Sequence, residues 1–243
     1  MLVRWVTGFL DSPSVDVEPF WLAVTGTTLS ARRDGGVFAT LLPADGDAYL
    51  RVQVVGGGPA RAHLDLHVAD VPAGAAEAVA LGAVVVSADE GLVVLRSPAG
   101  IVFCVTPWRG EGVRPAPVRW PVGQASAVDQ LALDIPAGAY EAEVEFWAAL
   151  TGWQRRASDL PEFRFLQGAP GLPVRLLMQR IGTSAAGVHL DFACDGVEAE
   201  VARHAELGAT VVRRSAGGWT TLRDPAGREY CVTGRAPVFP ARA

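Results

Sequence analysis

Hydrophobic and polar residues alternate strictly over residues 63–68, which predicts a β-strand with two different faces. His63, Asp65 and His67 share one face, and the apolar residues between them share the other. Polar side chains at every second position of a strand either form hydrogen-bonded pairs on a half-buried face or line a ligand site. The pattern leaves both interpretations open.

This strand opens a longer pattern of one strand, one helix and three further strands. A helix is expected between Asp70 and Gly82, because a proline stands in its first turn and a glycine at its end. Short apolar runs predict the three strands at 83–87, 91–97 and 101–106. The segment is therefore a βαβββ module.

The module recurs later in the chain. Residues 188–233 repeat residues 62–106, with His189 standing 126 positions after His63. The aspartates two residues further on keep the same offset, as do the Leu-Gly-Ala segments at the helix ends. The chain is therefore a duplication that covers nearly its whole length.

The other two modules follow from the same offset and are less regular. Their predicted strands and helices lie at 2–10, 11–26, 29–32, 37–42 and 48–55 in the first half, and at 128–135, 140–151, 162–167 and 173–180 in the second. Asp195 directly precedes the last helix and is expected to cap it.

A proline- and glycine-rich segment separates the halves. Four prolines and three glycines lie within residues 107–125, a composition typical of a linker. The predicted organisation is therefore a first domain at 1–107, a linker at 108–125, a second domain at 126–235 and a tail at 236–243.

The chain has four modules, and two of them carry an HLD strand, a helix ending in Leu-Gly-Ala and a Pro-Ala-Gly turn. This arrangement resembles the vicinal oxygen chelate superfamily. Within it, the glyoxalase-like and bleomycin-resistance-like proteins are the most similar. The resemblance spans residues 2–106 and 126–233. It implies an α+β fold with two tandem glyoxalase-like domains, each a curved eight-stranded sheet around a pocket, with the helices outside.

The resemblance also indicates where a metal ion would bind. Metal-dependent relatives hold it with side chains that here correspond to Gln130, Gln179, His189 and Cys231 in the second domain, and to Thr7, Gln53, His63 and Cys104 in the first. Cys231 stands where those relatives have a glutamate, and amides bind divalent ions weakly. We therefore expect no metal cofactor; if one is bound, His189, Cys231, Gln130 and Gln179 would be its ligands. Cysteines between apolar neighbours are also typical of small core residues.

We expect a metal-independent protein that binds a small hydrophobic or aromatic molecule in a sheet-lined cup. Its expected ligand-binding residues are Gln130, Gln179, His189, Asp191, Glu229 and Cys231 in the second domain, and Gln53, His63, Asp65, His67 and Cys104 in the first. No catalytic residue is assigned. The alternative is a metal-dependent lyase, isomerase or dioxygenase of the same superfamily. Glyoxalase I activity is not expected, because the missing glutamate would move the substrate proton. In a third hypothesis, one domain is only a structural partner of the other.

Composition narrows the class of protein. Half of the residues are hydrophobic, 19% are charged and the mean hydropathy is +0.24, which is typical of a packed globular protein. A net charge of −5 argues against nucleic-acid binding. No apolar run has the length of a membrane span or a secretory signal, and three cysteines without CxxC spacing suit a reducing compartment. We expect a cytoplasmic protein whose domains pair either within one chain or across a homodimer.

Overall fold

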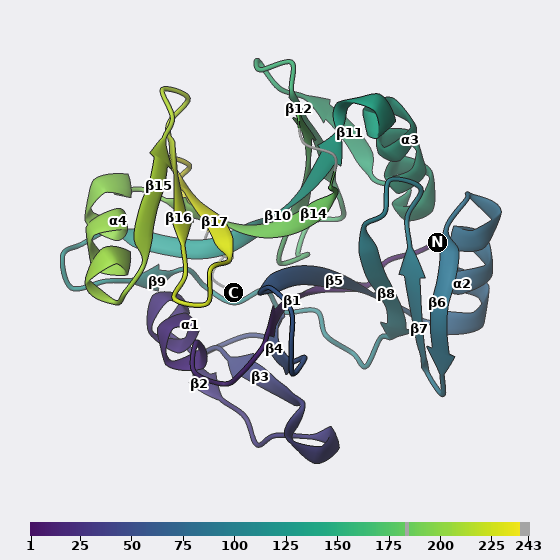
Figure 1. Cartoon of the computed structure of the whole chain (residues 1–243), viewed down its shortest axis with the longest axis horizontal. Coiled ribbons are helices and arrows are strands. Elements are labelled where there is room, and N and C mark those ends of the chain that lie inside the picture. Colours follow the sequence, from purple (N-terminus) through teal and green to yellow (C-terminus); the bar gives the residue numbers. More distant parts are fainter. Residues whose placement is uncertain (183–184, 239–243) are drawn as a thin grey trace. The chain divides into compact units, whose positions relative to one another are not determined.

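The computed structural model describes residues 1–182 and 185–238 and has an α+β fold (Figure 1). The elements of the first half are β1 (Trp5–Ser12), α1 (Glu18–Thr25), β2 (Thr28–Leu29), η1 (Asp34–Gly36), β3 (Phe38–Leu42), β4 (Leu50–Val54), β5 (Arg61–Val68), α2 (Val71–Ala80), β6 (Val84–Asp89), β7 (Leu92–Arg96) and β8 (Val102–Pro107). Those that follow are β9 (Val118–Arg119), β10 (Ala125–Pro136), η2 (Ala137–Ala139), α3 (Tyr140–Thr151), β11 (Gln154–Ala157), β12 (Phe163–Gln167), β13 (Arg175–Ile181), β14 (Gly187–Cys194), α4 (Val197–Glu206), β15 (Thr210–Arg214), β16 (Trp219–Arg223) and β17 (Glu229–Thr233). Within the described ranges, no helix combines the length and apolar character required to cross a bilayer.

The strands form one sheet in each half of the chain. The first sheet has the order β2-β3-β4-β1-β5-β8-β7-β6, and the second has the order β11-β12-β13-β10-β14-β17-β16-β15. Neither sheet closes on itself, because within the described residues the first and last strands of each order are not paired with each other. The predicted α+β class and the four tandem βαβββ modules are confirmed. The second sheet has a ninth strand, β9, which pairs with β10 and comes from the predicted linker.

In each sheet, the first and last strands of one module pair in parallel. β5 runs parallel to β8 with Asp65 beside Cys104, and β14 runs parallel to β17 with Asp191 beside Cys231. A parallel pair needs a long crossover connection, and here a helix and two strands supply it. The register places the aspartate of the HLD strand next to the cysteine of the closing strand.

The chain forms two compact units, and each combines segments from both sequence halves. Unit 1 consists of Met1–Gly8, His63–Gly112 and Leu131–Val188. Unit 2 consists of Phe9–Ala62, Val113–Gln130 and His189–Ala243. The domain boundaries after residues 107, 125 and 235 stay a prediction, and the predicted tail beyond residue 238 lies outside the described residues.

In unit 1, the helices α2 and α3 pack against one face of β8. Phe103 is fully buried, with its ring 4.9 Å from that of Trp147 on α3. Val105, on the same face, contacts α2 at Gly74. Because side chains alternate along a strand, Cys104 lies on the face away from these helices.

In unit 2, the helices α1 and α4 pack against β14 and β17 in the same manner. Trp21 of α1 stacks on Phe192 at a centroid distance of 6.4 Å and meets Tyr230 edge-on at 5.2 Å. His204 of α4 lies 5.1 Å from Phe192. These rings occupy one side of the two strands, so Cys231 lies on the other side.

Part of the predicted linker is folded into unit 2. The indole Nε1 of Trp120 donates to Ser126 Oγ at 2.9 Å, and the guanidinium of Arg203 lies 3.4 Å from the Trp120 ring centroid. Specific contacts of this kind do not form in an extended linker. Trp120 and the short strand β9 therefore pack on unit 2.

Two local predictions are wrong. The helix expected from Asp11 begins only at Glu18, and Asp11 and Ser12 complete β1 instead. Arg228 explains why the strand continues to Ser12, because its guanidinium donates to the carbonyl oxygen of Asp11 at 2.5 Å and to Ser12 Oγ at 2.8 Å. β11 was not predicted, because its four residues are all exposed and carry no apolar pattern.

Asp195 is not the cap of the last helix. The N-cap of α4 is Gly196, and no side chain caps it. Asp195 Oδ1 instead accepts a hydrogen bond of 2.6 Å from the backbone nitrogen of Ala125, at the start of β10. The aspartate therefore fixes the entry of a strand rather than the start of a helix.

Candidate functional site

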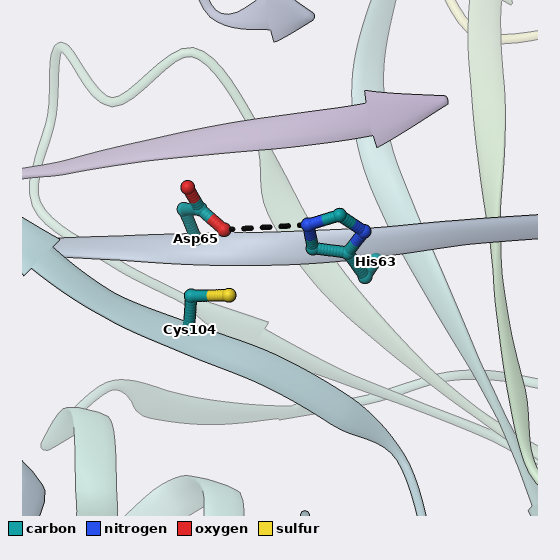
Figure 2. Close-up of side chains that lie close together, drawn as sticks. All are labelled: His63, Asp65 and Cys104. Carbon is teal, nitrogen blue, oxygen red and sulfur yellow. Dashed lines mark ion pairs between the residues drawn. The ribbon is translucent and has the colours of Figure 1, made fainter. Parts of the chain in front are cut away.

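Three side chains of unit 1 converge on the face of β5 and β8 that lies away from the helices (Figure 2). His63 Nε2 lies 3.6 Å from Asp65 Oδ1, and one donor atom from each of His63, Asp65 and Cys104 lies within 4.8 Å of the others. All three side chains are buried. Imidazole, carboxylate and thiol groups are therefore held together at one point of the sheet.

Local sequence and strand register together explain this convergence. His63 and Asp65 are two residues apart, so both point to the same side of β5. Cys104 lies directly beside Asp65 in the parallel pairing of β5 with β8. The third group therefore comes from a residue about 40 positions further along the chain, which the crossover connection brings into place.

Unit 2 contains the same constellation. His189 Nδ1 lies 2.9 Å from Asp191 Oδ1, and a donor atom of Cys231 lies within 4.8 Å of both groups. Asp191 and Cys231 are buried, and His189 is slightly more exposed. The duplication has thus preserved a His-Asp-Cys cluster in each unit.

The cluster of unit 2 has additional polar support. Gln130 of β10 donates a hydrogen bond from its amide nitrogen to Asp191 Oδ2 and is itself buried. Thr221 Oγ1 lies 3.6 Å from Cys231 Sγ, within the range of a hydrogen bond to sulfur. Gln130, predicted as a ligand-binding residue, therefore acts on the carboxylate of the cluster.

In unit 1 a second histidine stands beside the cluster. His67 Nε2 and Thr7 Oγ1 are 2.8 Å apart, and His67 Nδ1 lies 3.8 Å from Glu111 Oε1. His67 is buried, as expected for a residue that shares the polar face of its strand with His63. The structure thus places Thr7 and His67 together, as neighbours on the polar side of β1 and β5.

The remaining predicted residues lie elsewhere. Glu229 is half exposed on β17 and accepts a hydrogen bond of 2.7 Å from Arg223, so it is engaged at the strand end. Gln53 lies on β4 in unit 2, and Gln179 lies on β13 in unit 1. Each glutamine thus belongs to the compact unit that does not contain the cluster of its own sequence half. Their role in a ligand site stays a prediction.

The donor set of each cluster fits zinc better than iron. Zinc binds imidazole nitrogen, thiolate sulfur and carboxylate oxygen, and a catalytic zinc site uses three protein ligands and keeps one position open. A non-haem iron oxygenase uses two imidazoles and one carboxylate, whereas each cluster has a single imidazole. Oδ1 of Asp65 and Oδ1 of Asp191 are buried and accept no hydrogen bond among the described residues, although each faces a histidine nitrogen, at 3.6 and 2.9 Å. A buried carboxylate oxygen without a hydrogen bond can coordinate a cation.

The third donor of each cluster, Asp65 or Asp191, was not predicted as a metal ligand. From the sequence, each metal site had one histidine and one cysteine as firm ligands, and Asp65 and Asp191 were predicted to bind a ligand or to pair with the histidines, but not to hold a metal ion. The aspartates do face the histidines, but the parallel register also places them beside the cysteines. The HLD strand and the closing Cys-Val-Thr strand contain all three donors, but only their parallel pairing shows that the aspartate lies beside the cysteine.

The sequence matches the model of a known domain family over most of its length. The match is to the glyoxalase-like domain and covers residues 10–106 and 130–233. No curated protein is a significant sequence match to the chain.

Several solved structures share the fold at low sequence identity. The halotolerant catechol dioxygenase BphC is 15% identical with a TM-score of 0.64, covering 99% of this chain and 90% of its own. The 2,3-dioxygenase LapB from Pseudomonas sp. KL28 is 14% identical with a TM-score of 0.64 and covers 99% and 94%. A variant of 4-hydroxymandelate synthase from Streptomyces coelicolor is 15% identical with a TM-score of 0.62 and covers 98% and 95%.

Proposed function

Because this chain belongs to the family of glyoxalase-like domains, we propose that it binds a small molecule at the polar faces of its sheets, through a zinc-type divalent ion held by each His-Asp-Cys cluster. The observation that carries this proposal is the repeated convergence of three different donor types, His189, Asp191 and Cys231 in unit 2 and His63, Asp65 and Cys104 in unit 1. When bound, such an ion supplies a Lewis acid that attracts an oxygen or other anionic group of the ligand.

The residues of the chain have distinct tasks in this proposal. The histidine, aspartate and cysteine of each cluster hold the ion. Gln130 orients Asp191 through its amide, in the way that outer groups orient metal-binding carboxylates. The cysteine must lose its proton to act as a ligand, so binding of the ion releases protons and strengthens as the pH rises.

We propose ligand binding rather than dioxygenase chemistry. Two of the structural relatives named above are dioxygenases and the third is a 4-hydroxymandelate synthase, but an identity near 15% transfers the fold alone. Each cluster lacks the second imidazole of an oxygenase iron site. Glyoxalase I activity is not proposed either, because Cys231 stands where metal-dependent relatives carry the glutamate that would move the substrate proton.

A second candidate function is binding without a metal. The observation in its favour is the 2.9 Å approach of His189 Nδ1 to Asp191 Oδ1, with Gln130 donating to the other oxygen of the same carboxylate. A carboxylate that lies beside an imidazole and accepts a hydrogen bond on its other oxygen can remain buried without a metal ion. The polar face would then hydrogen-bond directly to a hydrophobic or aromatic ligand.

Metal analysis separates the two candidates. Protein purified without a metal-affinity step is saturated with Zn²⁺, passed over a desalting column and analysed by inductively coupled plasma mass spectrometry. We expect one ion per cluster, loss of one ion in His189→Ala and of the other in His63→Ala. Co²⁺ in place of zinc should give a thiolate-to-metal absorption band that weakens in Cys231→Ser.

Cys194→Ser is the matched control. Cys194 is also buried in unit 2, but it is absent from the cluster, and burial raises the pKa of its thiol to about 11. This variant should retain the full metal content. Zinc content far below one ion per cluster in the folded wild type contradicts the metal proposal. Saturable quenching of tryptophan fluorescence by an aromatic ligand in chelator-treated protein would then support the second candidate.

A further inference from the structure

Residues 113–116 are hydrogen-bonded to the loop 45–47 in unit 2. The backbone nitrogen of Val113 donates to Asp47 Oδ2 at 2.8 Å, and the backbone nitrogen of Ala116 donates to Asp45 Oδ1 at 2.9 Å. A third hydrogen bond of 2.7 Å runs from the Asp47 nitrogen to the Val113 carbonyl oxygen. A segment of linker composition is thus fixed in place by two side chains and one backbone contact.

Glycine at position 46 permits this close approach. Its φ is +68°, and a Cβ added there would lie 2.8 Å from the backbone nitrogen of Pro115 and from the carbonyl oxygen of Val113. Other residues disfavour this φ and would also collide with the segment. Two independent features therefore build the contact, which argues against a chance approach of a loose linker.

A cavity of about 210 Å³ lies behind this contact, entirely within unit 2. Its deep walls include Leu41, Leu50 and Phe192, which are all at most 3% exposed. Ala44 and Asp45 at its rim are exposed. The cavity therefore extends from the surface into the apolar packing of the unit.

The polar groups at the cavity already have partners. Tyr49 donates from its hydroxyl to the carbonyl oxygen of Val128 at 2.8 Å, and Thr25 donates from Oγ1 to the carbonyl oxygen of Trp21 at 2.5 Å. Burial raises the pKa of Tyr49, opposed in part by Arg114, so the phenol stays neutral. The carboxylate of Asp45 at the rim disfavours an anion.

This cavity is separate from the His-Asp-Cys cluster of unit 2. It reaches the side of β14 that carries Phe192, whereas Asp191 and the cluster lie on the other side of the same strand. Binding at one place therefore does not require binding at the other.

We propose that this cavity is a second small-molecule site, which takes an uncharged apolar compound about the size of one substituted aromatic ring. A protein cavity of about 150 Å³ with apolar walls already accepts benzene or xenon. The volume here exceeds that, and apolar walls with engaged polar groups favour a ligand that needs no hydrogen bond.

Benzene, the charged analogue benzoate and three variants test this proposal. Binding is measured by NMR chemical-shift titration of the apo and zinc-treated protein. We expect saturable benzene binding in both samples and at least tenfold weaker binding of benzoate. Ala127→Leu adds side-chain volume at the cavity lining and should weaken benzene binding at least tenfold. Ala88→Leu, at an exposed position of β6 in unit 1, should bind as the wild type does.

Independence from zinc keeps this test distinct from that of the proposed function. If Ala127→Leu fails to fold, Ala44→Leu at the exposed rim serves in its place. The proposal is overturned if benzene does not saturate, if benzoate binds equally well, or if the folded cavity variant binds as tightly as Ala88→Leu.

Discussion

The indole Nε1 of Trp147 donates a hydrogen bond of 2.7 Å to Glu143, one turn earlier on α3. The other carboxylate oxygen of Glu143 accepts from the backbone nitrogen of Ala99, in the turn before β8. In unit 2, Trp21 donates to Asp224, and this aspartate stands on the corresponding turn itself. In both units a buried indole is linked to a turn through a carboxylate. The carboxylate comes from the helix in unit 1 and from the turn in unit 2.

Removing this carboxylate from unit 1 should lower stability. Glu143→Ala leaves the buried indole N–H of Trp147 and the part-buried backbone N–H of Ala99 without their acceptor. Burial raises the pKa of Glu143 against its hydrogen bonds, so loss of the charge offsets part of the effect. We expect the free energy of unfolding in urea to fall by about 1–3 kcal/mol. Glu145→Ala, which removes an exposed ion pair with Arg155 on the same helix, should change it little. Equal effects of the two variants would contradict this account.

Arg228 should matter more than its surface counterparts. Its buried guanidinium pairs with Asp224 at 2.9 Å and donates to the Arg61 carbonyl oxygen. Arg228→Met leaves Asp224 as a buried charge without its ion pair, which typically costs about 3–5 kcal/mol. We expect chemical denaturation to show such a loss, and the double variant with Asp224→Asn to recover part of it. Arg223→Met, at a half-exposed ion pair, is the control. A double variant no more stable than Arg228→Met would rule out the charge explanation.

The stability of unit 2 should depend on pH through His204. Burial lowers the pKa of His204 below its ordinary value of 6.5, although Glu200 opposes this. Below pH 6.5 the unfolded chain therefore binds a proton that the folded state does not, so stability decreases as the pH falls. Thermal unfolding of the wild type between pH 7.5 and 5 should show this slope, and His204→Gln should flatten it.

Glu200 acts in the same direction at lower pH. Burial alone would raise the pKa of Glu200, but hydrogen bonds from His204, Arg203 and Ser126 together lower it well below its usual range. A depressed carboxyl pKa gives stability that is present above the unfolded value and lost as the pH falls toward the folded value. The His204 contribution should therefore be sought above pH 5, where Glu200 stays ionised in both states. An unchanged slope in His204→Gln would show that other groups cause it.

Substitution of Gly46 should open the cavity of unit 2. Gly46→Ala places a Cβ 2.8 Å from the Pro115 nitrogen at a φ of +68°, which displaces the segment 113–116. Gly35→Ala has the same φ of +68°, with no atom within 4 Å of the added Cβ. Both variants carry the backbone strain of about 1–2 kcal/mol, so any further loss in Gly46→Ala reports the collision. Benzene binding should be weakened only in Gly46→Ala. Identical behaviour of the two variants would exclude a role for the close contact.

Local signals predicted the elements well where they act within a few residues. Asp70 caps α2 through a hydrogen bond from the Ala73 nitrogen, and Gly26 and Gly152 end their helices with φ values of 65° and 67°. The 126-residue repeat then predicted all four modules, because an element recognised in one half of the chain indicated the matching element in the other half. The predicted core positions Trp21 and Trp147 are fully buried.

Long-range pairing could not be deduced from these signals. Asp195 stands where a cap is common, but the backbone nitrogen of Ala125, 70 residues away, takes its carboxylate instead. The role of Asp65 and Asp191 as third donors depended on parallel strand register, which no local pattern specifies. The compact units likewise follow from helix packing between modules that are distant in sequence.

The division of the chain between the two units sets an order for vectorial synthesis. Unit 1 has its last segment at Leu131–Val188, whereas unit 2 needs both Phe9–Ala62 and the strands after His189. A ribosome adds about 5–20 residues per second, so the early segment of unit 2 waits on the order of ten seconds for its partners. During that interval Trp21 and Phe20, fully and almost fully buried in the finished protein, have no native core to enter. Nascent chains of this protein should therefore depend on chaperones most strongly before β17 emerges.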